Sequence, residues 1–149
     1  MAKDFKEVIK FAIGQEKEAI DFYTDLQKKV NTDASKKILQ DFIDMERGHI
    51  TMLTSFDKEN AESFVAPKVT DLKISDYMID YDPNEKVGFQ EILTIAAKKE
   101  EAAKQLYEKL AAETDDEKVK NVFLKIGAEE AKHKLQLETL FDDEIFAEN

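Results

Sequence analysis

Two Glu-x-x-His motifs supply the residues best suited to metal chemistry: Glu46 with His49, and Glu130 with His133. The chain has no other histidine. Residues three positions apart on a helix are neighbours on one surface, separated by about 4.5 Å along its axis, so both side chains of a motif can reach one metal ion. Carboxylate oxygen and imidazole nitrogen are suitable ligands for divalent metals.

The residues around each motif predict that these polar side chains point into a hydrophobic core. Steps of three and four residues run through both motifs, which is the spacing of one buried helix face. In the first motif this pattern consists of Leu39, Phe42, Glu46, His49, Leu53 and Phe56. In the second it consists of Phe123, Ile126, Glu130, His133, Leu137 and Leu140.

Two further helical patterns contain one acidic residue each. One runs through Phe5, Ile9, Ala12, Glu16, Ala19, Tyr23, Leu26 and Val30, and the other through Phe89, Leu93, Ala96, Glu100, Ala103, Tyr107 and Leu110. Asn31 lies 15 positions from both Glu16 and Glu46, so an antiparallel hairpin with its turn there brings the two carboxylates to the same height.

The two halves of the sequence repeat each other at a fixed offset. Glu16 and Glu100, Glu46 and Glu130, His49 and His133, and Tyr23 and Tyr107 are each 84 positions apart. Self-similarity at one period indicates a repeated structural unit. Two such hairpins assemble four carboxylates and two imidazoles inside one bundle, the arrangement found in di-iron and di-manganese carboxylate proteins.

Composition favours a helical chain, with 4 glycines, 2 prolines and 37% charged residues. The 149 residues fit a single domain, residues 1–149. We therefore expect an all-α four-helix bundle built from two repeated antiparallel hairpins. The expected helices span about 4–30, 33–58, 83–112 and 115–141, with a long crossover at about 59–82.

Short polar motifs are expected at the helix starts. Thr32 or Asp33 can cap the second helix, Pro83 fits the first turn of the third, and Thr114 with Glu117 resembles a capping box for the fourth. The acidic residues 141–149 are expected to fray, to dock on the bundle or to meet a partner.

Charge and residue usage exclude several functional classes. The formal net charge of −11 makes nucleic acid and anionic membrane surfaces poor partners. The absence of cysteine excludes disulfides, thiol catalysis and thiolate-bound metals. No stretch approaches the roughly 20 apolar residues that cross a bilayer, so we expect a soluble, cytoplasmic protein without nucleic-acid or membrane partners.

Hard oxygen ligands combined with imidazole nitrogen favour iron or manganese over copper(I) or a structural zinc ion. The simpler alternatives are core histidines satisfied by hydrogen bonds, and glutamates that are partly exposed or held in buried ion pairs. Glu129, like Glu18 and Glu101, lies off the buried pattern and is expected to face solvent.

Two tyrosines and three glycines lie near the predicted ligands. Tyr23 and Tyr107 either pack in the core or use their hydroxyls to orient a ligand carboxylate or to supply an electron. Gly14, Gly48 and Gly127 each lie within three residues of a predicted ligand, which indicates close packing or substrate access there.

These segments resemble the ferritin-like superfamily and, within it, the rubrerythrin-type domains. The segments QEKEAIDFYTDL and KKEEAAKQLYEKL resemble its Glu-x-x-Ala-x-x-aromatic-Tyr helices, and MERGHITML and AEEAKHKLQL resemble its Glu-x-x-His helices. The resemblance implies a ferritin-like bundle with two iron ions per chain, or manganese, and with Glu46 and Glu130 bridging them. The implied ligands are Glu16, Glu46, His49, Glu100, Glu130 and His133.

The sequence departs from rubrerythrins in two ways. It lacks the four cysteines of a rubredoxin module, and Ala103 stands where rubrerythrins place an additional glutamate. We expect a di-iron oxidoreductase that reduces hydrogen peroxide or oxygen with electrons from an external donor such as a rubredoxin. The alternatives are ferritin-like iron storage with ferroxidase activity, and a metal-free structural or interaction bundle. A homodimer is expected, since most soluble oligomers take that form.

Overall fold

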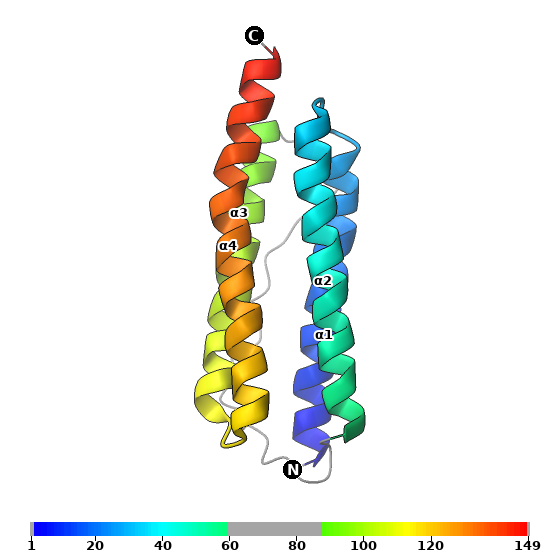
Figure 1. Ribbon diagram of the computed structural model, residues 1–149, viewed down its shortest axis with the longest axis vertical. Helices are drawn as coiled ribbons and strands as arrows, with labels where there is room; N and C mark the ends of the chain where they lie inside the picture. Colours follow the sequence, from blue (N-terminus) through cyan, green and yellow to red (C-terminus); the bar gives the residue numbers. More distant parts are fainter. Residues whose placement is uncertain (1, 60–87, 149) are drawn as a thin grey trace.

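The computed structural model of the chain describes residues 2–59 and 88–148, with side chains at 6–56, 88–142 and 144. The described residues form α1 (Ala2–Gln27), α2 (Asp33–Glu59), α3 (Phe89–Glu113) and α4 (Glu117–Glu148). They contain no strand. This arrangement confirms the predicted all-α, ferritin-like four-helix bundle (Figure 1).

The four helices pair as two antiparallel hairpins, α1 with α2 and α3 with α4 (Figure 1). Within the described chain, α2 and α4 make the main helix contact between the hairpins. The last turn of α2 and the first turn of α3 lie at opposite ends of the bundle (Figure 1). The predicted crossover at 59–82 lies almost entirely outside the described residues.

Three helix boundaries differ from the prediction. α1 ends at Gln27 rather than at about 30. Just after it, the backbone N–H groups of Lys28 and Lys29 donate to carbonyls three residues earlier, over 3.2 and 2.9 Å, which tightens the end of the helix. α3 begins at Phe89 rather than at about 83, because Gly88 has an extended backbone with φ −69° and ψ 158°. α4 continues to Glu148, well beyond the expected end at about 141.

The caps of α2 and α4 are formed by side-chain oxygens. Thr32 caps α2 by accepting a hydrogen bond from the backbone N–H of Ser35 over 3.0 Å. Asp116 caps α4 by accepting from the N–H groups of Lys118 and Val119 over 2.9 and 3.1 Å. The predicted capping box at Thr114 is wrong, because Thr114 has an extended backbone two residues before the cap.

The C-terminal part of α4 docks on the α1–α2 connection through Glu144, whose side chain is 2% exposed. Its carboxylate accepts hydrogen bonds from the backbone N–H groups of Asn31, over 2.9 and 3.1 Å, and Thr32, over 3.2 Å. The acidic residues 141–149 were expected to fray, to dock on the bundle or to meet a partner. At Glu144, the side chain docks on the bundle.

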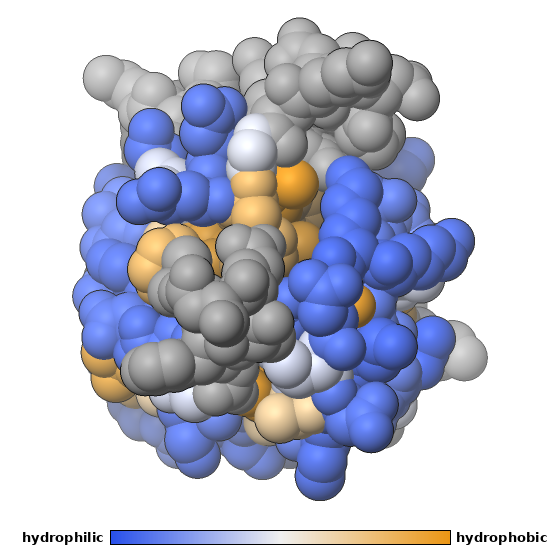
Figure 2. Space-filling view, turned by 90° about the horizontal axis from the view of Figure 1, so that it is seen from above, coloured by the Kyte–Doolittle hydropathy of each residue, from blue (hydrophilic) through white to orange (hydrophobic). Residues whose placement is uncertain are grey.

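The hydrophobic core consists of two clusters, one toward each end of the bundle. One includes Ile9, Phe56 and Phe123, and the other includes Phe42 and Leu140. Viewed from one end, hydrophilic side chains surround apolar ones (Figure 2). In the described chain, no helix is both long and apolar enough to cross a membrane.

Candidate metal centre

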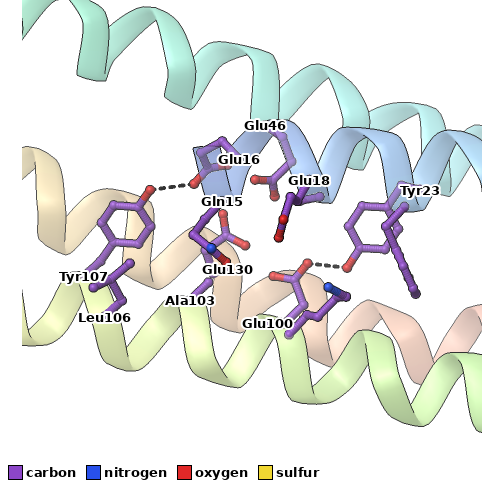
Figure 3. A pocket seen from close by; sticks show the side chains of 13 residues that line it. Gln15, Glu16, Glu18, Tyr23, Glu46, Glu100, Ala103, Leu106, Tyr107 and Glu130 are labelled. Atoms are coloured by element: carbon purple, nitrogen blue, oxygen red, sulfur yellow. Dashed lines mark hydrogen bonds between the residues drawn. The ribbon is translucent and has the colours of Figure 1, made fainter. Parts of the chain in front are cut away.

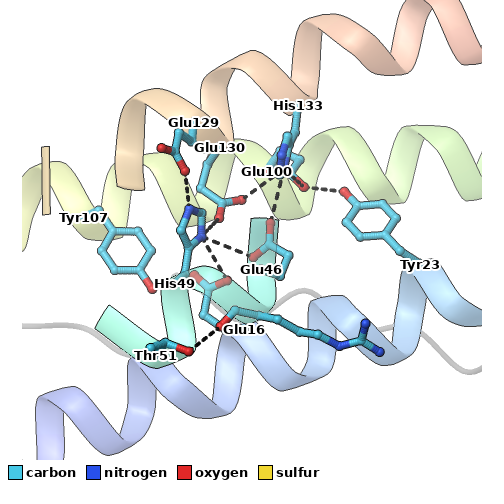
Figure 4. Close-up of polar contacts among 11 residues, drawn as sticks. Glu16, Tyr23, Glu46, His49, Thr51, Glu100, Tyr107, Glu129, Glu130 and His133 are labelled. Carbon is cyan, nitrogen blue, oxygen red and sulfur yellow. Dashed lines mark hydrogen bonds and ion pairs between the residues drawn. The ribbon is translucent and has the colours of Figure 1, made fainter. Parts of the chain in front are cut away.

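The six predicted ligands lie together between the two hydrophobic clusters (Figure 4). All four helices contribute, and each side chain is at most 3% exposed. The residues are Glu16 on α1, Glu46 and His49 on α2, Glu100 on α3, and Glu130 and His133 on α4. The helix faces predicted from spacing are therefore the faces that meet in the interior.

The six side chains form two overlapping groups. One contains Glu16 and His49, the other contains Glu100 and His133, and both include Glu46 and Glu130. Within each group, one ligand atom from every residue lies within 4.8 Å of the others. The two carboxylates that belong to both groups are Glu46 and Glu130, the pair for which the resemblance implies a bridging role.

Both imidazoles direct Nδ1 toward the carboxylates. His49 Nδ1 lies 3.1 Å from Glu130 Oε1, and His133 Nδ1 lies 3.1 Å from Glu46 Oε1. Each histidine thus approaches the glutamate of the other motif more closely than its own, which is 3.7 Å from His49 and 3.9 Å from His133. The two Glu-x-x-His motifs form one centre across the α2–α4 interface.

Protonation compensates for the buried negative charge. Burial by itself lowers the pKa of His133, but contacts with Glu100 and Glu46 outweigh it and raise that pKa to about 9. The pKa of His49 is raised as well: burial lowers it, and contacts with Glu46 and Glu129 outweigh burial. A proton on His133 therefore supplies positive charge among the carboxylates, and the shift at His49 acts in the same direction.

The pKa values of the two shared carboxylates are shifted in opposite directions. Burial raises the pKa of Glu130 well above its usual value, and the nearby Glu100 and Glu46 raise it further. Burial also opposes ionisation of Glu46, but its contacts with the imidazoles of His133 and His49 outweigh burial and lower its pKa. A cation that displaced these protons would take over the same role.

Several buried polar atoms in this centre lack a hydrogen-bond partner among the described side chains. They are Glu46 Oε1, Glu100 Oε2, Glu130 Oε1 and His133 Nδ1. Buried polar atoms are normally satisfied, and these four all belong to the overlapping groups. Four carboxylates also balance the charge of two divalent ions. The donor set therefore fits a pair of hard or borderline cations.

Two tyrosine hydroxyls hold the outer glutamates from across the bundle. Tyr107 on α3 donates to Glu16 Oε1 on α1 over 2.7 Å, and Tyr23 on α1 donates to Glu100 Oε1 on α3 (Figure 3). Burial, together with nearby carboxylates, raises the pKa of both phenols well above the usual value of 10, so both remain protonated donors. Both tyrosines pack in the core and also orient a carboxylate.

A small cavity lies between the two tyrosine–glutamate bonds, with a volume of about 40 Å³ (Figure 3). Its lining includes Ala19, Ala103, Glu18 and Lys99 beside the buried carboxylates. Since a water needs roughly 10–15 Å³ of such volume, the space suits molecules of the size of water, oxygen or peroxide. Ala103 leaves room next to Glu100 and Glu130 that a larger side chain would fill.

Glu129 contacts the candidate metal centre, although its spacing predicted a side chain that faces solvent. It is 20% exposed, and its Oε2 lies 2.6 Å from Nε2 of His49 (Figure 4). Helix periodicity places it off the buried face of α4, but the neighbouring α2 covers that edge. Glu18 is exposed, as predicted. Glu101 is 36% exposed and pairs with Lys134 over 3.2 Å.

The predicted close packing of glycines is not found at two of the three positions. Among the described atoms, nothing lies within 4 Å of where a Cβ at Gly14 or Gly48 would be. A Cβ at Gly127 would lie 3.5 Å from Cβ of Tyr107, an ordinary van der Waals contact. None of these positions requires glycine for steric reasons in the described structure.

A four-helix bundle whose helices bring together four glutamates and two histidines in this way is typical of the ferritin-like carboxylate proteins that hold two iron or two manganese ions. The family model described as Rubrerythrin matches residues 1–57 and 91–148, and the chain belongs to the rubrerythrin family. Comparisons with curated proteins and with solved structures gave no match.

Proposed function

We propose that this protein is a di-iron carboxylate oxidoreductase that reduces hydrogen peroxide or oxygen. The observation that carries the proposal is the pair of four-residue groups sharing two carboxylates, beside a cavity of about 40 Å³. Two ferrous ions supply two electrons, the number needed to reduce one hydrogen peroxide to two waters with uptake of two protons.

The protein side chains have distinct roles in this proposal. Glu46 and Glu130 neutralise charge at both metal positions, and Nδ1 of each histidine completes one position. The tyrosine hydroxyls fix the outer carboxylates, which reduces the freedom that metal binding must remove. The lining of the cavity limits access to small oxidants.

Electrons must return to the centre after each turnover. We propose that a donor protein, such as a rubredoxin, supplies them. We also propose a homodimer, in keeping with the commonest symmetry of soluble oligomers. The physiological oxidant is hydrogen peroxide or oxygen, with iron as the working metal and manganese as the alternative.

Anaerobic loading with Fe(II), followed by desalting and iron analysis, tests the proposal. We expect about two irons per chain, and oxidation by peroxide or oxygen that is visible by rapid mixing. Glu46→Ala/Glu130→Ala should abolish iron retention and peroxide consumption. The matched control Glu108→Ala/Glu138→Ala changes two exposed glutamates on α3 and α4 and should retain both.

The alternatives predict different outcomes in the same experiment. Iron storage would oxidise many Fe(II) ions per chain and would require a large closed assembly, which size-exclusion chromatography detects. A metal-free bundle would retain no iron although its helical content is normal. Either result would contradict the proposed oxidoreductase.

A further inference from the structure

The two halves of the centre differ in the outer contact of their histidines. Glu129 on α4 places Oε2 2.6 Å from Nε2 of His49 on α2. The position 84 residues earlier, which has the equivalent place on α2 relative to His133, is Met45. Methionine supplies no carboxylate, so the internal repeat is broken at this pair of positions.

His133 has an apolar neighbour instead. All its carboxylate contacts in the described structure are at Nδ1, and its ring stacks on Phe42 with centroids 4.2 Å apart and an interplanar angle of 22°. The residue equivalent to Phe42 in the second half is Ile126, which cannot stack in this way. One imidazole is thus held by a carboxylate and the other by a phenyl ring.

The other ligands of the two positions are closely matched. Glu16 and Glu100 each accept a tyrosine hydrogen bond, both are 3% exposed, and Glu46 and Glu130 serve both groups. The contacts at the outer edges of the histidines are therefore the clearest difference between the two positions.

A carboxylate that accepts the Nε2–H of a histidine has two effects on a metal at Nδ1. It fixes the tautomer and the ring orientation, and it makes the imidazole a stronger electron donor. Removing such a carboxylate typically weakens metal binding by about 10- to 100-fold. An aromatic ring in stacking contact fixes the ring plane but accepts no proton.

We propose that Glu129 is a positioning residue that makes the Glu16/His49 position bind its metal ion more tightly than the Glu100/His133 position, so that the two ions load in a fixed order. The inference rests on the di-metal site of the proposed function and extends it to an inequivalence of the two ions. The repeated ligand set alone would predict two similar positions.

Anaerobic titration with Co(II) at fixed pH tests this order, because its visible absorption reports each ion as it binds. We expect two steps in the natural protein. Glu129→Met, which makes the two halves alike at this pair of positions, should weaken the first step by about 10- to 100-fold and bring the steps closer together. Met45→Glu should strengthen the second step. The control Glu138→Met changes an exposed residue of α4 and should leave both steps in place.

Proton NMR of the protein with one equivalent of Co(II) identifies the histidine involved. A hydrogen-bonded Nε2–H exchanges slowly, so we expect one paramagnetically shifted, exchange-protected imidazole N–H in the natural protein and its loss in Glu129→Met. Normal circular dichroism of that variant would exclude loss of fold as the cause.

The possible outcomes separate this inference from the proposed function. If the natural protein retains neither Co(II) nor Fe(II), the proposed function fails. If it binds two ions but Glu129→Met leaves the first step and the protected N–H in place, only the present inference is overturned. Repulsion between the ions separates the steps in every variant, so the decisive quantity is the change in the first step between the natural protein and Glu129→Met.

Discussion

The hydroxyl of Tyr107 donates a hydrogen bond to Oε1 of Glu16 over 2.7 Å, and this bond joins α3 of one hairpin to α1 of the other. Tyr23 and Glu100 repeat the relationship in the opposite direction. Each tyrosine therefore serves the glutamate of the other half rather than that of its own helix (Figures 3 and 4). The two bonds flank the cavity and tie the hairpins together at the metal centre.

Removing one of these hydroxyls is expected to lower stability without emptying the site. Tyr107→Phe takes the donor from a buried carboxylate, and hydrogen bonds to charged groups contribute about 1.5–3 kcal/mol. We expect the free energy of unfolding in urea to fall by about that amount, with iron content still near two per chain. An unchanged urea midpoint would show that Glu16 finds another donor, and Tyr23→Phe provides a parallel measurement.

Filling the cavity is expected to slow oxidation but not metal binding. Ala103→Leu places a larger side chain in a space of about 40 Å³ beside Glu100. We expect iron retention to be unchanged and the oxidation rate in rapid mixing to fall by about tenfold or more. The control Ala112→Leu adds the same atoms at an exposed position of α3. Equal rates in the two variants would place oxidant entry elsewhere.

The metal-free protein is expected to lose stability as pH rises above 6.5. The pKa of His133 is raised to about 9, so its stabilising contribution is complete below the unfolded value of about 6.5 and is lost as pH rises through about 9. The raised pKa of Glu130 acts in the same direction, because its proton is lost as pH rises.

Metal is expected to reverse this pH dependence, since it binds the deprotonated imidazoles. Melting temperatures measured at pH 6.5 and 9, first with a chelator and then with excess Mn(II), test the direction of the pH dependence without and with metal. The Tm should fall with pH in the chelator, and the stabilisation by Mn(II) should grow with pH. A metal-free Tm that rises over this range would contradict the expected protonation of His133.

Glu144 is expected to anchor the α1–α2 connection. Glu144→Ala removes the charged acceptor for the backbone N–H groups of Asn31 and Thr32 and should lower the free energy of unfolding by about 2 kcal/mol. Burial raises the pKa of this carboxyl, but hydrogen bonds from Asn31, Ser35 and Thr32 outweigh burial and lower it. Its contribution should therefore be complete above about pH 4.5 and be lost progressively as pH falls below that value. Asp142→Ala, at an exposed position two residues earlier in α4, is the control.

Replacing Gly48 is expected to stabilise the protein. Alanine there meets no described atom within 4 Å and gains helix propensity, so Gly48→Ala should raise the free energy of unfolding by about 0.5–1 kcal/mol. Urea denaturation of the metal-free protein measures the change. A destabilised variant would show that the glycine meets a surface outside the described residues, such as a second chain.

Helix spacing alone was sufficient to place the predicted ligands on buried faces. Glu46 and His49 interrupt an otherwise apolar pattern, and the 84-residue offset relates them to Glu130 and His133. Burial on a helix repeats every three or four residues, so a sequence reports directly which side of each helix faces inward. The hairpin pairing followed from the short connection near Asn31.

Only the tertiary structure determines which side chains of neighbouring helices contact each other. Glu129 stands at the edge of its helix face, where the position of α2 determines whether it meets solvent or His49. The tyrosines lie on the predicted face, but the approach of α1 to α3 selects the glutamate that each one binds. Periodicity fixes the direction of a side chain relative to its own helix axis. It contains no information on the rotation and height of the neighbouring helix, which set these partners.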